Sequence, residues 1–71
     1  MKKKLDYQLR TIRKASHLTQ QQVADKLEMD RSTYAYYETG KTTPSIFTLM
    51  KLAQLFQVPI DYILNIKNKD G

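Results

Sequence analysis

Residues 18–40 read LTQQQVADKLEMDRSTYAYYETG, and this stretch decides the fold. Thr19 and Gln22 have the spacing of a capping box, in which two side chains satisfy free backbone amides at a helix start. Asp30 is a second acceptable N-cap, and Gly40 suits the left-handed backbone found just beyond a helix end. The stretch therefore predicts two short helices, over 20–27 and 31–38, joined by a very short turn.

Two short helices joined by so few residues cannot lie antiparallel, so the turn is predicted to set them at a steep angle, as in a helix-turn-helix. Ala24 is small enough for the close crossing. The residues expected to fill the seam are Val23, Leu27, Tyr34 and Tyr37. The outward face of the second helix then carries Arg31, Ser32, Thr33, Ala35 and Tyr36. Side chains of these types can contact the base edges or phosphates of DNA.

Apolar residues at helical spacing flank the central stretch on both sides. Leu5, Leu9 and Ile12 lie at i, i+4 and i+7, which predicts a first helix that ends near Ser16. After Pro44, Ser45 is suited to cap a fourth helix. The face of this helix expected to meet the core carries Ile46, Leu49, Leu52, Ala53 and Phe56.

A fifth helix is predicted over 60–66, after Pro59, with Ile60, Ile63 and Leu64 toward the core. No alternating apolar pattern competes with these helices, so the predicted fold class is all-α, a five-helix bundle that contains a helix-turn-helix. We expect a basic N-terminal arm at 1–4, the folded domain at 5–66 and a polar tail at 67–71.

Composition restricts the function. A chain of 71 residues has room for one small domain, and 41% hydrophobic with 27% charged residues is a globular balance. There is no cysteine, which excludes disulfides and thiolate metal sites and suits a reducing cytoplasm. Twelve Lys and Arg against seven Asp and Glu give a net charge of +5, and half of these cations lie in the first fourteen residues. A polyanionic partner is therefore indicated.

Several other functions are not supported. No apolar run approaches the ~18 residues of a membrane span, so we expect no membrane association. Gly40-Lys41-Thr42 ends a loose nucleotide-binding pattern, but it follows a predicted helix rather than a buried strand. His17 has no second histidine, and the acidic residues near the turn have no histidine partner. We expect no enzymatic activity, no metal and no cofactor.

An ordered set of motifs carries a family resemblance. It includes Leu18-Thr19-Gln20, Val23-Ala24-x-x-Leu27, Tyr37-Glu38-x-Gly40-Lys41 and Pro44-Ser45, together with Leu9-Arg10-x-x-Arg13, Leu49-x-x-Leu52-Ala53 and Ile60-Asp61-x-Ile63-Leu64. Over residues 5–66 the sequence resembles the phage-repressor and Cro-like helix-turn-helix domains, also called the xenobiotic-response-element family. The resemblance implies a lambda-repressor-like bundle that binds double-stranded DNA as a homodimer, with the helix over 31–38 in the major groove.

The resemblance also implies roles for individual residues. Those expected to read bases are Arg31, Ser32, Thr33 and Tyr36, of which Thr33 is a nearby base or phosphate contact. Those expected to bind phosphates are Gln20, Thr39, Lys41, Thr42 and Thr43. Arg13 and Glu38 match an ion pair between the first and third helices. The sequence departs from the family at three turns, where His17, Glu28 and Gln57 stand in place of glycine.

The fifth helix has a second apolar stripe, formed by Tyr62 and Ile66 at i and i+4. With Leu55 and Pro59, these residues are expected to form a two-fold dimer contact, and Phe47 is an alternative patch. We expect a sequence-specific regulator of transcription, a repressor that binds a palindromic operator as a homodimer. It would act at the nucleoid, in the cytoplasm of a bacterial or phage-infected cell. The alternative is an antitoxin or adaptor whose helix-turn-helix mainly binds a protein partner.

Overall fold

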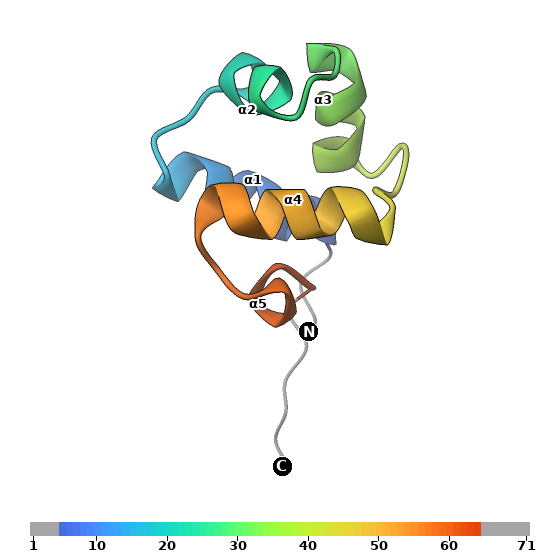
Figure 1. Cartoon of the computed structure of the whole chain (residues 1–71). Coiled ribbons are helices and arrows are strands. Elements are labelled where there is room, and N and C mark those ends of the chain that lie inside the picture. The colour runs from blue at the N-terminus through green and yellow to red at the C-terminus, as the bar shows by residue number, and fades with distance from the viewer. Residues whose placement is uncertain (1–4, 65–71) are drawn as a thin grey trace.

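The computed structural model describes residues 5–64, and these residues form five helices (Figure 1). They are α1 (Leu5–Ala15), α2 (Gln20–Lys26), α3 (Arg31–Thr39), α4 (Ile46–Phe56) and α5 (Ile60–Leu64). Between residues 5 and 64 there is no strand. The predicted all-α class is confirmed, and the helix ends agree with the sequence-based ones to within a residue or two. The basic arm, the tail and residues 65–66 of the predicted fifth helix lie outside the described residues.

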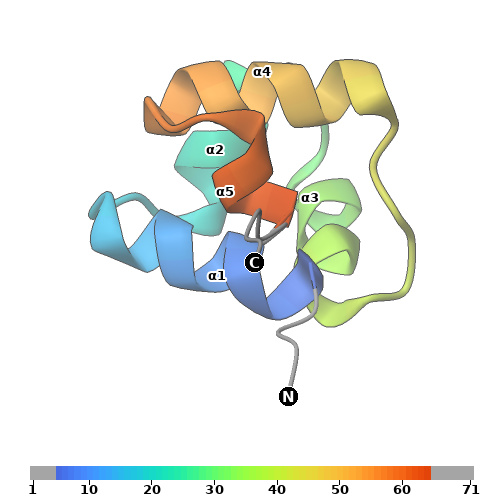
Figure 2. The same ribbon diagram turned by 90° about the horizontal axis from the view of Figure 1, so that it is seen from below.

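The helices are arranged around one core. In Figure 1, α2 and α3 lie at one end of the molecule, α1 and α4 cross its middle, and α5 lies at the other end. Seen from below, α5 sits between α1 and α4, with which it makes its contacts (Figure 2). The pair α2 and α3 packs together, and α3 also packs on α1. The second helix of the predicted helix-turn-helix is therefore held from two sides.

Two of the three expected caps have the expected hydrogen bonds. The Thr19 hydroxyl accepts from the Gln22 amide at 3.0 Å, and the Thr19 amide donates to Gln22 Oε1 at 2.8 Å. The Ser45 hydroxyl accepts from the Thr48 amide at 3.2 Å. Asp30 takes the N-cap position with extended backbone, but its side chain makes no capping hydrogen bond. The predicted N-cap position of Asp30 is therefore confirmed, although its side chain does not satisfy a backbone amide.

The core is formed mainly by the predicted residues. Those with a fully buried side chain are Leu9, Val23, Ala24, Tyr34, Leu52 and Ile63. Ile46 was predicted to face the core together with Leu49, but its side chain is 52% exposed. It is the first residue of α4, one turn before the first buried residue of that helix. Helical periodicity identified the correct face of α4, but it did not show at which residue of the helix other helices begin to bury that face.

Three turns use left-handed backbone without glycine. The φ angles are 61° at His17, 58° at Glu28 and 59° at Gln57, compared with 81° at Gly40. The turns therefore keep the conformation that glycine favours, although side chains replace it. Left-handed backbone costs a residue with a Cβ roughly 1–2 kcal/mol. The packing of the helices on either side must offset this cost.

Candidate nucleic-acid interface

The outer face of α3 carries the residues expected to read bases. Arg31, Ser32 and Thr33 are exposed in its first turn, and Tyr36 is 44% exposed one turn later. Tyr34 points the opposite way and is fully buried in the core. With ~100° between successive residues, Arg31, Ser32 and Tyr36 share one face and Thr33 lies at its edge. The core packing of α3 therefore presents a polar, cationic face to solvent.

The loop after α3 carries most of the residues expected to bind phosphates. Thr39, Lys41, Thr42 and Thr43 are all exposed around the turn at Gly40. The turn is closed by the Lys41 amide, which donates to the Tyr36 carbonyl at 2.9 Å. The Thr39 hydroxyl donates to the same carbonyl at 3.3 Å. The loop is thus anchored on the backbone of Tyr36, next to the base-reading face.

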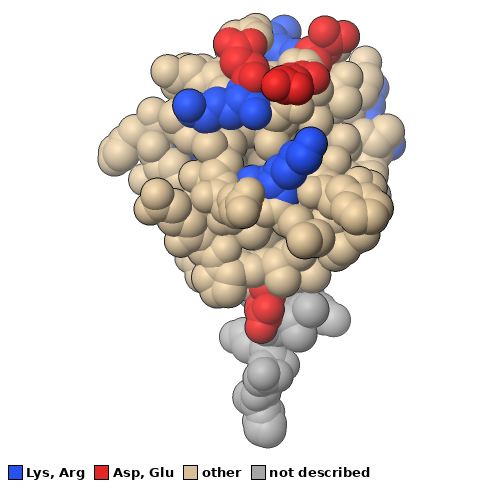
Figure 3. All heavy atoms as spheres, in the orientation of Figure 1, with Lys and Arg blue, Asp and Glu red and all other residues tan. Residues whose placement is uncertain are grey.

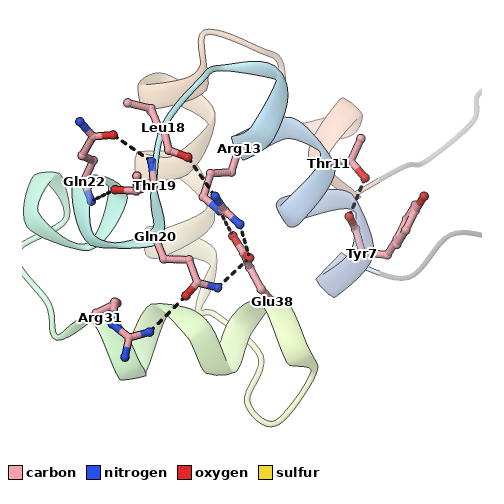
Figure 4. Close-up of polar contacts among 9 residues, drawn as sticks. All are labelled: Tyr7, Thr11, Arg13, Leu18, Thr19, Gln20, Gln22, Arg31 and Glu38. Atoms are coloured by element: carbon pink, nitrogen blue, oxygen red, sulfur yellow. Dashed lines mark hydrogen bonds and ion pairs between the residues drawn. The ribbon is translucent and has the colours of Figure 1, made fainter.

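The side chain of Gln20 lies between a buried acid and an expected base reader (Figure 4). Its Nε2 donates to Glu38 Oε1 at 3.0 Å, and its Oε1 accepts from Arg31 Nη1 at 3.3 Å. The amide orientation is therefore fixed by both neighbours, and one N–H remains for a phosphate. No local sequence motif predicts these contacts, because the three residues are far apart along the chain.

The expected ion pair between α1 and α3 is present in the structure. Arg13 Nε lies 2.6 Å from Glu38 Oε2, and Arg13 Nη2 lies 3.1 Å from Oε1. Arg13 Nη1 also donates to the Leu18 carbonyl at 2.9 Å, in the segment between α1 and α2. Glu38 is 3% exposed. One buried carboxylate thus ties α1, the start of α2 and α3 together.

Burial and hydrogen bonds oppose each other at Glu38. Burial alone would raise the pKa of its carboxyl, but the hydrogen bonds from Arg13 and Gln20 and the charge of Arg13 hold that pKa below its usual range. The same pair raises the pKa of the Arg13 guanidinium. Burial raises the pKa of the Tyr34 phenol, and the neighbouring Glu38 carboxylate raises it further. All three groups therefore keep their usual charge states at neutral pH.

The residues expected at a dimer contact lie on a different surface. Tyr62 is 54% exposed, Pro59 is exposed and Leu55 is half-buried; Ile66 lies outside the described residues. The alternative patch on α4 includes Phe47, which is 72% exposed. The face along α4 is mostly uncharged, whereas acidic side chains gather at the end formed by α2 and α3 in this view (Figure 3).

No helix among the described residues is long and apolar enough to cross a membrane.

Comparison with known families agrees with this geometry. The model of the helix-turn-helix family matches residues 9–63, which include all the described expected base-reading and phosphate-binding residues. The chain belongs to the helix-turn-helix family. The resemblance to repressor-like domains is therefore confirmed. This is a family of DNA-binding domains and not of enzymes, so on that ground the expectation of no enzymatic activity is also confirmed.

Individual relatives are regulators of transcription by name. The chain is 41% identical over 58 residues to the uncharacterized HTH-type transcriptional regulator YobD of Bacillus subtilis, covering 82% of this chain and 52% of that protein. It is 34% identical to the cryptic phage CTXphi transcriptional repressor RstR of Vibrio cholerae, with the same two coverages. The chain thus spans about half the length of these relatives.

A solved structure has the same fold. The crystal structure of a transcriptional regulator from Listeria innocua superposes with a TM-score of 0.84 at 28% sequence identity. The match covers all of this chain and 66% of that one. The five-helix arrangement is therefore that of a known regulator of transcription.

Proposed function

We propose that the chain is a sequence-specific, double-stranded DNA-binding regulator of transcription, a repressor that acts as a homodimer on a palindromic operator. The observation that carries this proposal is the two-sided character of α3. Tyr34 and Glu38 fasten one side of the helix to the rest of the fold, while Arg31, Ser32 and Tyr36 point outward. A rigidly held helix with such an outer face suits major-groove readout.

Each group of residues has a distinct part in this proposal. The guanidinium of Arg31 has the fork that fits O6 and N7 of guanine, and the Ser32 and Tyr36 hydroxyls both donate and accept hydrogen bonds. Lys41 and the neighbouring threonines bind phosphates and fix the position of α3 along the duplex. Gln20 adds a phosphate contact at the start of α2 through its remaining N–H.

Dimerisation and repression are the finer parts of the proposal. A two-fold pair of these domains presents two α3 helices to half-sites about one helical turn apart, which doubles the sequence that is read. The exposed Tyr62 and Pro59 supply apolar surface for such a contact. Repression is favoured because a dimer bound across a promoter blocks other proteins sterically, and RstR is named a repressor.

Selection of duplexes from a randomised DNA pool tests the proposal directly. We expect enrichment of one two-fold symmetric sequence, bound roughly 10³-fold or more tightly than a scrambled duplex. Enrichment of a single half-site would contradict the homodimer only. Equal binding of all duplexes would contradict sequence-specific readout and favour the alternative, an antitoxin or adaptor that uses this domain to bind a protein partner.

A further inference from the structure

Tyr36 and Lys41 are in direct contact on the outer surface. The Lys41 ammonium nitrogen lies 5.4 Å from the centroid of the Tyr36 ring. A cation over the face of an aromatic ring within ~6 Å is attracted by the negative charge density of that face. The contact therefore joins a residue on the base-reading face of α3 to a residue of the loop that follows it.

The backbone turn at the end of α3 brings these two residues together. The Gly40 and Lys41 amides both point at the Tyr36 carbonyl, with the Lys41 bond at 2.9 Å. This is the hydrogen-bonding pattern of a helix that ends in a left-handed residue, and it places the residue after the turn beside the last helical turn. The pairing thus follows from the backbone and not only from two flexible side chains.

The backbone conformation of the turn suits glycine. Gly40 has a φ of 81°, which disfavours any residue with a Cβ. A Cβ at this position would also lie 2.8 Å from Asp6 Oδ2, on the first turn of α1. Glycine therefore suits this position, and its left-handed backbone directs Lys41 back toward the last turn of α3.

We infer that Lys41 positions the Tyr36 ring for base reading, and so contributes to sequence preference as well as to phosphate binding. Contact with the ring face uses none of the three N–H donors of the ammonium group in a hydrogen bond, so the same group can donate to a phosphate. Phosphate binding and ring placement then reinforce each other. This inference rests on the proposed function, and it changes the expected role of Lys41 from a phosphate contact alone to a positioning residue.

The experiment compares Lys41→Ala with Tyr36→Leu, Lys41→Arg and the double variant Lys41→Ala/Tyr36→Leu. Lys51 is exposed on α4, so Lys51→Ala removes one positive charge and leaves the contact between Lys41 and the Tyr36 ring in place. Affinity is measured for the preferred duplex and for each single base-pair change in one half-site. Tyr36→Leu identifies the base pair that depends on the ring. All five variants alter exposed side chains, and circular dichroism checks that each remains folded.

We expect Lys41→Ala to reduce discrimination at that same base pair by about 2- to 5-fold, in addition to weakening all duplexes. The double variant should lose no more discrimination than Tyr36→Leu alone, because the two residues act together. Lys41→Arg, which keeps a cation over the ring, should retain the preference, and Lys51→Ala should not alter it. Uniform weakening by Lys41→Ala, with discrimination at this base pair intact, would overturn the inference.

A DNA-free measurement separates this inference from the proposed function. Protons above the face of an aromatic ring are shielded, so the ε-methylene protons of Lys41 should move downfield in the NMR spectrum of Tyr36→Leu. If the wild-type chain shows no sequence preference, the proposed function is overturned, and so is a base-reading role for Tyr36, even when this chemical-shift change is seen. A wild-type preference without the shift would overturn only the positioning role of Lys41.

Discussion

Arg13 on α1 and Glu38 on α3 form a two-point ion pair, with Nε 2.6 Å from Oε2 and Nη2 3.1 Å from Oε1. The Glu38 carboxylate accepts a further hydrogen bond from Gln20, whose carbonyl oxygen accepts one from Arg31. A continuous set of polar contacts therefore runs from the interior to the proposed DNA-reading face. Because desolvated charges need partners, this set is expected to determine both stability and the placement of Arg31.

Removal of one member of the ion pair should destabilise the fold strongly. We expect Glu38→Ala to lower the free energy of unfolding by about 3 kcal/mol, compared with ~0–1 kcal/mol for an exposed pair, because Arg13 would keep a poorly compensated charge. Thermal and urea unfolding of Arg13→Ala, Glu38→Ala and the double variant measure the coupling. The double variant should lose clearly less than the sum of the two single losses. Strict additivity would show that the pair contributes no interaction energy.

The same carboxylate should make stability depend on pH. The folded-state pKa of Glu38 lies below its ordinary value of 4.5, so its contribution is complete above that pH. The contribution is lost as the pH falls through the folded-state pKa. In melts from pH 7 to pH 2 at fixed ionic strength, the stability difference between the wild type and Glu38→Gln should be constant above pH 4.5 and should narrow below it. Glu28→Gln, at an exposed acid, is the control. If the stability difference between the wild type and Glu38→Gln does not change at low pH, the lowered pKa of Glu38 in the folded state is contradicted.

The sequence predicted local structure well because the signals for it are local. Capping residues such as Thr19 and Ser45 act on amides within three positions, so a short motif is enough to place a helix start. The long-range polar contacts were harder to predict. Gln8 is a polar residue of α1, yet it is buried, and its Nε2 donates to the Tyr62 carbonyl at 2.9 Å. Nothing near Gln8 in the sequence specifies a partner on α5.

The candidate site shows the same division. Helical periodicity placed Arg31 and Tyr36 on the outer face and Tyr34 inside, because that depends only on the 3.6-residue repeat. It could not indicate that Arg31 meets Gln20 or that Lys41 lies over Tyr36. Those contacts depend on how α2 crosses α3 and on the exact turn at Gly40. The exposure of Ile46 was not predicted for a related reason, since periodicity does not show how much of a helix's apolar face is buried by other helices.

Glycine at the left-handed turns should stabilise the domain. Gln57 has a φ of 59° at the C-terminal end of α4, and this end of the helix lies away from α3 in Figures 1 and 2. We expect Gln57→Gly to raise the free energy of unfolding by roughly 0.5–1 kcal/mol, as relief of strain exceeds the added chain entropy. Urea unfolding measures this change. Lys51→Gly, inside α4, should lower stability by about 1 kcal/mol. A loss of stability in Gln57→Gly would mean that its side chain makes contacts worth more than the strain.

The proposed dimer contact can be tested by placing a charge on each exposed aromatic patch. Tyr62→Glu should weaken self-association and raise the protein concentration needed to fill the operator, because a carboxylate would be buried in an apolar contact. Phe47→Glu, at the more exposed site on α4, is the matched comparison and should have little effect. Analytical ultracentrifugation with and without the selected duplex distinguishes the two variants. If Phe47→Glu alone separates the subunits, the contact lies on α4 instead of α5.

Base reading and phosphate binding should respond differently to substitution at Arg31. Its fork fits a guanine edge, whereas a lysine at this position keeps the charge but cannot form the same two parallel hydrogen bonds. We expect Arg31→Ala to cost about 1–3 kcal/mol on the selected operator and to relax preference at one base pair of each half-site. Arg31→Lys should lose a similar part of that preference but retain the salt dependence of wild-type binding, because that dependence follows the number of neutralised phosphates. Affinities for the operator and a scrambled duplex, measured across a salt series, separate the two effects. If Arg31→Ala weakens binding to both duplexes by the same factor, α3 does not read sequence through Arg31, and binding to a protein partner becomes the better account of the exposed face.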